Sequence, residues 1–82
     1  MEKVLVTGGS GYIALHCIAE LLKENYHVRT SLRNMERKEE VQKSVSKYLN
    51  ENNSLEFCKL DLLSDDGWDN AVNGCEYVLH LA

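Results

Sequence analysis

The chain has 82 residues, of which 44% are hydrophobic and 27% are charged, and its formal net charge is −4 at pH 7. This length predicts one small domain, and the acidic balance argues against nucleic acid as the main partner. No run of eighteen apolar residues occurs, and the first residues lack the apolar core of a signal peptide. We therefore expect no membrane span and a cytoplasmic location.

The first half of the chain predicts two strands that alternate with two helices. An apolar run over residues 3–7 ends at glycine and predicts a strand, and an apolar stripe at spacings of three and four predicts a helix over 12–24. Residues 27–32 include the β-branched Val28 and Thr30 and predict a second strand, in which Arg29 is expected to emerge at the surface. A polar helix is predicted over 35–49, with Asn34 as its N-cap.

The second half continues the same alternation. Strands are predicted over residues 55–60 and 76–81, and a short helix over 65–73 is ended by Gly74. Alternation of strand and helix predicts an α/β fold with a parallel sheet and helices on both faces. The expected architecture is a doubly wound, Rossmann-type sheet with strand order 3-2-1-4.

Cysteine and histidine spacing predicts no metal site. Cys17, Cys58 and Cys75 are widely separated, and no C-x-x-C pair is present. We therefore expect neither zinc nor a disulfide framework, and interpret the three thiols as small buried hydrophobes in a reducing compartment. The three histidines fall on three different predicted elements, so they do not form a ligand set.

A glycine-rich turn joins the first predicted strand to the first helix. Gly8, Gly11 and Ala14 follow one another at intervals of three. Gly8 allows a sharp turn, Gly11 allows a ligand to approach the backbone, and Ala14 keeps the helix close to the sheet. A Walker A loop is excluded because no Gly-Lys-Ser/Thr follows. The remaining alternative is a glycine turn that binds no ligand.

The start of the first helix offers donors for an anion. The N–H groups of Gly11, Tyr12 and Ile13 are expected to be unpaired at the positive end of the helix dipole, and Ser10 adds a hydroxyl. Such a helix start is a receptor for a pyrophosphate. The turn therefore predicts a dinucleotide cofactor.

The end of the second strand indicates which dinucleotide is bound. Dinucleotide folds carry an acidic residue about 20 residues after the glycines, which binds the ribose 2′-hydroxyl. Here that count leads to Ser31, Leu32 and Arg33, none of which is acidic. A guanidinium can bind a 2′-phosphate through two hydrogen bonds and stack on adenine, so Arg33 predicts NADP over NAD. Arg37 and Lys38 are mixed with glutamates and are expected on a solvated helix face.

Four motifs together resemble the extended short-chain dehydrogenase/reductases. They are the "VLVTGGSGYIALH" turn, the "VRTSLRN" strand end, the "KLDLLSDDGWDNAVNG" stretch and the "GCEYVLHLA" run. Within that family they look like the branch of dihydroflavonol-reductase-like and NAD-dependent epimerase/dehydratase-like members. The resemblance implies that Asp61 and Leu62 flank the adenine, and that Leu81 and Ala82 lie near the ribose and pyrophosphate.

The resemblance also implies what the chain lacks. The family transfers hydride with a Tyr-x-x-x-Lys pair, and none of the four tyrosines here has lysine four residues later. We therefore assign no catalytic residue. Residues 1–82 are interpreted as the truncated, NAD(P)-binding Rossmann domain of an oxidoreductase, which would reduce a carbonyl substrate when completed. The alternatives are a stand-alone NADP(H)-binding module without catalysis and a fragment of an NAD-dependent sugar-nucleotide epimerase/dehydratase.

The fourth predicted strand offers an apolar edge. In the family a further strand pairs with it, whereas here the apolar sequence "YVLHL" is left without that neighbour. We therefore expect homo-oligomers through this edge or a tendency to aggregate.

Overall fold

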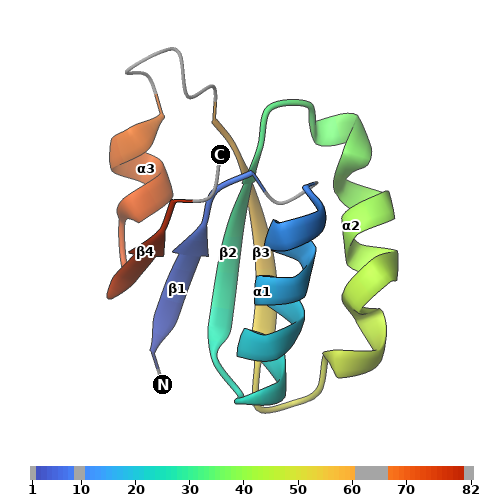
Figure 1. The fold of residues 1–82 in the computed structure, drawn as a ribbon. Coiled ribbons are helices and arrows are strands. Elements are labelled where there is room, and N and C mark those ends of the chain that lie inside the picture. The colour runs from blue at the N-terminus through green and yellow to red at the C-terminus, as the bar shows by residue number, and fades with distance from the viewer. Residues whose placement is uncertain (1, 9–10, 61–66, 81–82) are drawn as a thin grey trace.

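A computed structural model describes residues 2–8, 11–60 and 67–80. Its centre is a parallel sheet whose strands lie in the order β3-β2-β1-β4 (Figure 1). The strands are β1 (Lys3–Val6), β2 (His27–Leu32), β3 (Ser54–Lys59) and β4 (Tyr77–Leu79). The predicted Rossmann-type order 3-2-1-4 is confirmed.

Helices cover both faces of this sheet. They are α1 (Tyr12–Lys23), η1 (Met35–Arg37), α2 (Lys38–Val45), η2 (Ser46–Tyr48) and α3 (Trp68–Val72), where η marks a 3₁₀ turn. Helices α1 and α2 lie side by side on one face (Figure 1), and α3 packs on the other. No helix in the described part of the chain is long and apolar enough to cross a membrane.

Two hydrophobic clusters follow from the alternation of side chains along the strands. In β1, Val4 and Val6 face α1 and α2, whereas Leu5 faces α3. The larger cluster contains Val4, Val6, Ala14, Ile18, Leu22, Val28, Leu32, Val41 and Val45. The smaller cluster contains Leu5, Leu60 and Ala71, with Cys58, Trp68 and Cys75 packed against it. Both faces of the sheet are therefore occupied, as a doubly wound fold requires.

The prediction of one continuous helix over 35–49 is wrong. The segment is divided into η1, α2 and η2, although Asn34 does cap its start by accepting a hydrogen bond from the Glu36 N–H at 2.9 Å. The Ser46 hydroxyl donates to the Lys43 carbonyl at 3.1 Å. Serine side chains that bond nearby carbonyls compete with the helical backbone, and the break falls where Ser46 does so.

Two other expectations about single residues need correction. Arg29 does not emerge at the surface, because its side chain is only 16% exposed and lies between the sheet and α3. The three cysteines are free thiols, but they are half-buried rather than fully buried. Burial raises the pKa of the Cys58 and Cys75 thiols, which makes both less reactive.

Candidate cofactor-binding site

The candidate site lies at the carboxyl edge of the parallel sheet. Gly8 follows the end of β1, Arg33 follows the end of β2, and His80 follows the end of β4. Because the strands are parallel, these three positions share one edge, and α1 begins beside them (Figure 1). Ligands of open α/β sheets bind at this edge.

The turn between β1 and α1 is held by a chain of hydrogen bonds. Gly8 has a φ of +73°, which favours glycine. Its N–H donates to the Ser31 hydroxyl at 3.1 Å, and its carbonyl accepts from the Gly11 N–H at 2.9 Å. The Gly11 carbonyl in turn accepts from the Leu15 N–H at 2.9 Å. The prediction that the Gly11 N–H is unpaired is therefore wrong in this structure.

The next two amides fit the expected role of anion donors better. The Tyr12 and Ile13 N–H groups donate no hydrogen bond to any described residue. Both side chains are exposed, at 78% and 67%. At the positive end of this twelve-residue helix, two amide donors therefore have no acceptor among the described residues.

Gly11 forms an open cradle next to these donors. Its backbone is extended, with φ −75° and ψ 153°, so the conformation itself does not require glycine. A Cβ built there would meet the Gly8 carbonyl oxygen at 3.4 Å, an ordinary contact distance. Because nothing in the described fold requires glycine here, a bound group is the better explanation for the missing side chain. This geometry fits the pyrophosphate of a dinucleotide.

Three buried hydroxyls lie at the strand ends, and one of them, that of Ser31, bonds the turn; sequence reasoning gave none of them a role. Thr7, Thr30 and Ser31 lie at the carboxyl ends of β1 and β2 and are at most 2% exposed. The Thr30 hydroxyl donates to the Val6 carbonyl at 2.8 Å. The Thr7 Oγ1 lies 3.2 Å from His80 Nδ1. The signal in the sequence was three hydroxyl residues at the ends of the first two predicted strands.

The other predicted site residues divide into two groups. Arg33 is exposed and comes directly after β2, at the same edge as the glycine turn. Five more predicted positions lie outside the described residues, namely Ser10, Asp61, Leu62, Leu81 and Ala82. Among the described residues, no three His, Cys, Asp or Glu side chains gather as a metal site would require.

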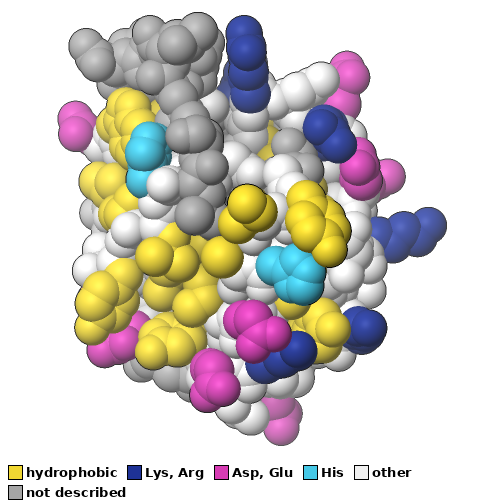
Figure 2. All heavy atoms as spheres, viewed as in Figure 1, with side chains coloured by type: hydrophobic (Ala, Val, Ile, Leu, Met, Phe, Trp, Pro, Cys, Tyr) yellow, Lys and Arg dark blue, Asp and Glu magenta, His cyan; other side chains and the backbone are white. Residues whose placement is uncertain are grey.

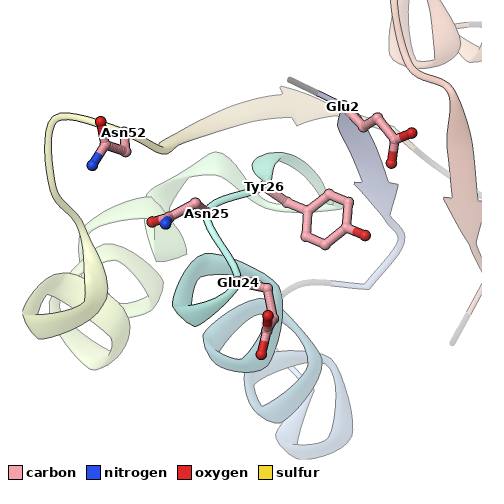
Figure 3. Close-up of a pocket in the computed structure, with 5 residues that line it drawn as sticks. All are labelled: Glu2, Glu24, Asn25, Tyr26 and Asn52. Atoms are coloured by element: carbon pink, nitrogen blue, oxygen red, sulfur yellow. The ribbon is translucent and has the colours of Figure 1, made fainter.

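A hollow lies at the opposite edge of the sheet from the candidate site. It is lined by Glu2, Glu24, Asn25, Tyr26 and Asn52 (Figure 3). The Glu2 and Glu24 carboxylates lie apart and point in different directions, so they do not converge on a ligand (Figure 3). The residues precede the strands rather than follow them, and a parallel sheet does not usually bind ligands there.

Comparison with known proteins decides the family. The model of the NAD-dependent epimerase/dehydratase family matches residues 4–82. The chain belongs to this family. The resemblance to extended reductases that the motifs indicated is thereby confirmed.

The relatives of this epimerase/dehydratase family chain include plant reductases. Tetraketide alpha-pyrone reductase 2 of Arabidopsis thaliana is 38% identical over 82 residues, which cover 100% of this chain and 25% of that protein. Dihydroflavonol 4-reductase of Arabidopsis thaliana is 36% identical over 81 residues, which cover 99% of this chain and 21% of that protein. The chain therefore spans about a quarter of the length of these relatives.

A solved structure shares the fold. The crystal structure of Gre2 from Candida albicans in complex with NADPH superimposes with a TM-score of 0.79 and 27% sequence identity. The match covers 100% of this chain and 24% of that one. The carboxyl-edge geometry thus occurs in a chain whose fold matches that of an NADPH-bound protein.

Proposed function

We propose that this chain binds NADP(H) at the carboxyl edge of its sheet and forms the cofactor-binding portion of a dihydroflavonol-reductase-like oxidoreductase. The bound nicotinamide would supply the hydride that such an enzyme transfers to a carbonyl substrate. Residues 1–82 would act as one NAD(P)-binding unit in the cytoplasm. The single observation that carries the proposal is the open Gly11 backbone beside the Tyr12 and Ile13 amides, which have no acceptor among the described residues.

These groups suit a pyrophosphate in shape and charge. Amide donors at a helix start stabilise an anion, and a backbone without Cβ lets the phosphate oxygens approach. Ser10 would add a hydroxyl donor to the same phosphates. Asp61 and Leu62 are proposed to flank the adenine, and Leu81 and Ala82 to lie near the ribose and pyrophosphate.

Arg33 is proposed to select NADP over NAD. Its exposed guanidinium follows β2, where a ribose 2′-phosphate would be bound by two hydrogen bonds. The NADPH complex of the Candida albicans neighbour supports this assignment. The description of the matched family names NAD instead, so an NAD-dependent epimerase/dehydratase is the second candidate.

Titration of the 82-residue chain with NADPH and NADH tests both parts of the proposal. We expect NADPH to bind more tightly, and Arg33→Ala to raise the Kd for NADPH about 10- to 100-fold while leaving NADH unchanged. Arg37→Ala is the matched control, because the Arg37 guanidinium already pairs with Glu40 at 2.9 Å on an exposed helix surface. Equal affinity of the wild type for both coenzymes would refute the role of Arg33.

A different observation separates an enzyme portion from a stand-alone binding module. A longer coding sequence with Tyr-x-x-x-Lys beyond residue 82 would favour the oxidoreductase. NADPH binding without hydride transfer by the natural full-length product would favour a module that senses or buffers the coenzyme. Measuring the intact mass of the natural protein is the simplest way to distinguish the oxidoreductase from the binding module.

A further inference from the structure

We infer that Ser31 is a positioning residue for the dinucleotide site, which holds the glycine turn in its binding geometry and couples it to the strand that ends just before Arg33. This inference rests on the proposed function, because it assumes that the turn binds the coenzyme pyrophosphate. It assigns to Ser31 no contact with the coenzyme itself.

The first argument is the place of Ser31 in the hydrogen-bond chain. Its hydroxyl accepts the Gly8 N–H at 3.1 Å, and Gly8 in turn accepts the Gly11 N–H at 2.9 Å. Both polar groups of the Gly8 backbone are therefore engaged, one by the sheet and one by the start of α1. Gly8 has many accessible conformations, and this pair of bonds selects the one with a φ of +73°.

The second argument is burial. Ser31 is 2% exposed and lies inside β2, where its backbone pairs with Cys58 of β3. A buried hydroxyl is a fixed anchor, because packing on both sides of the strand leaves it little freedom to move. The turn is thus attached to β2, a central strand of the sheet, although Gly8 and Ser31 are 23 residues apart in the chain.

The third argument is the position of Ser31 relative to Arg33. Only Leu32 separates them, and β2 ends at that residue. A shift of the glycine turn relative to this strand end would misplace the pyrophosphate relative to the 2′-phosphate. One hydroxyl therefore sets the spacing between the two anion sites that we propose.

The neighbouring residue provides a matched control. Thr30 is fully buried, and its hydroxyl also bonds β1, but it donates to the Val6 carbonyl inside the sheet. Thr30→Val removes a strand-to-strand bond, whereas Ser31→Ala removes a strand-to-turn bond. Both variants are expected to lower the Tm. A difference between them in coenzyme affinity therefore reports the lost bond to the turn rather than a general loss of stability.

The experiment measures the Kd of the 82-residue chain for NADPH and for NADH. We expect Ser31→Ala to weaken both coenzymes by the same factor, about fivefold to tenfold, because both carry the pyrophosphate. Ser31→Thr, which keeps the hydroxyl, is expected to restore both affinities to within about twofold of the wild type. Thr30→Val is expected to leave both affinities within about twofold.

Each other result counts against the inference in a distinguishable way. If the wild type binds NADPH and the Ser31→Ala variant binds each coenzyme as tightly as the wild type does, Ser31 does not position the site, and the proposed function survives. Loss of NADPH affinity alone would also overturn the inference, since it would place the effect at the 2′-phosphate. If the wild type binds neither coenzyme, the proposed function fails and the inference fails with it. The NMR shift of the Gly8 amide proton gives a second readout, which must move in Ser31→Ala and return in Ser31→Thr.

Discussion

The two described glycines of the turn between β1 and α1 meet different physical demands. Gly8 has a φ of +73°, a region in which a side chain costs about 1 kcal/mol or more, whereas Gly11 is extended. We expect Gly8→Ala to lower the free energy of unfolding by about 1–2 kcal/mol. Gly11→Ala should change it by less than about 0.5 kcal/mol, because the new Cβ meets the Gly8 carbonyl at an ordinary 3.4 Å. Urea unfolding of both variants measures this difference.

The Gly11→Ala substitution, which should barely change stability, should have a large effect on coenzyme binding. A methyl group there occupies the space that we assign to the pyrophosphate, so Gly11→Ala should raise the Kd for NADPH by about tenfold or more. Calorimetric titration of the folded variant measures the change. An unchanged Kd would show that the phosphates do not approach the Gly11 backbone.

Asn53 is the buried amide that ties together the ends of two helical segments. It is 7% exposed, and its Nδ2 donates to the Leu22 carbonyl at 2.8 Å and to the Tyr48 carbonyl at 2.9 Å. Its Oδ1 accepts the Asn50 N–H at 2.9 Å. We expect Asn53→Ala to lower the free energy of unfolding by about 2–3 kcal/mol, because buried backbone groups lose their partners. Asn52→Ala, at an exposed position, is the control. A similar loss of unfolding free energy in both variants would contradict the role of the buried Asn53 hydrogen bonds.

The sequence predicted features that depend on neighbouring residues better than features that depend on residues far apart in the chain. The spacing of Gly8 and Gly11 and the cap at Asn34 were readable, because each depends on residues close in sequence. The bond from Gly8 to Ser31 was not readable, since it joins residues 23 apart and depends on how β1 and β2 are placed in the sheet. A buried serine in an apolar strand is visible in sequence, but its partner is not.

At the scale of elements, a charged cluster attaches α3 to the sheet. Glu56 on β3 accepts hydrogen bonds from Lys3 on β1 and Arg29 on β2, each at 3.0 Å. The Arg29 Nη1 then donates to the carbonyls of Asn70, Ala71 and Asn73 at 3.1, 2.9 and 2.7 Å. These carbonyls lie at the end of α3, where helical partners are missing and a cation is favourable. Three strands and one helix are thus joined through three side chains.

This cluster predicts a pH dependence of stability. Hydrogen bonds from Lys3 and Arg29 lower the pKa of Glu56, although partial burial opposes them. A carboxyl with a lowered folded pKa stabilises the fold above its unfolded value, about 4.3, and that contribution is lost as the pH falls through the folded pKa. We expect Glu56→Gln to destabilise by about 1 kcal/mol at pH 7, a modest amount because the Glu56 side chain is 42% exposed.

Urea unfolding between pH 7 and pH 3 would test the linkage. The difference between the wild type and Glu56→Gln should shrink as the solution becomes acidic, because the wild-type carboxylate becomes protonated and Gln does not titrate. Glu39→Gln is the control, since Glu39 is an exposed residue of α2 that pairs with no cation among the described residues. A constant difference across this range would contradict the assignment to Glu56.

Element types were predictable where hydrophobic periodicity was strong, and boundaries were less so. Strand β2 agrees with its predicted range 27–32, where Val28 and Thr30 are β-branched and Arg33 and Asn34 follow as polar residues. The helix predicted over 35–49 carries only a thin apolar stripe, and the structure divides it into three pieces. Weak periodicity does not show where serine side chains bond the backbone, as Ser46 does with the Lys43 carbonyl.

At the scale of the whole molecule, the strand order was predictable from alternation alone. Parallel strands joined by right-handed helical crossovers leave few arrangements, and the doubly wound order is the common one. The sequence predicted an apolar edge at the fourth strand, but it could not show how far each strand residue is exposed. Strands β1 and β2 are largely buried, whereas every residue of β4 is exposed.

The exposed β4 strand is an unusual surface for a parallel sheet. Within the described residues β4 pairs only with β1, and Tyr77, Val78 and Leu79 are 53%, 46% and 38% exposed. Figure 2 shows apolar side chains gathered over β4, β1 and α1. Tyr77 and Leu79 line a hollow there together with Val4, Leu21 and Tyr26. Parallel sheets normally bury both their faces, and an apolar edge strand is a template for pairing with another chain.

We therefore predict that the 82-residue chain self-associates through β4. Sedimentation velocity over a range of concentrations should show species heavier than the monomer, and Val78→Lys should reduce them, because a charge on an edge strand opposes pairing. Val72→Lys is the matched control, since Val72 is an equally apolar residue, 37% exposed, on α3. A wild type that stays monomeric at high concentration would refute association through this edge. An equal effect of both lysine variants would place the contact elsewhere, because only Val78 lies on the strand whose backbone would pair.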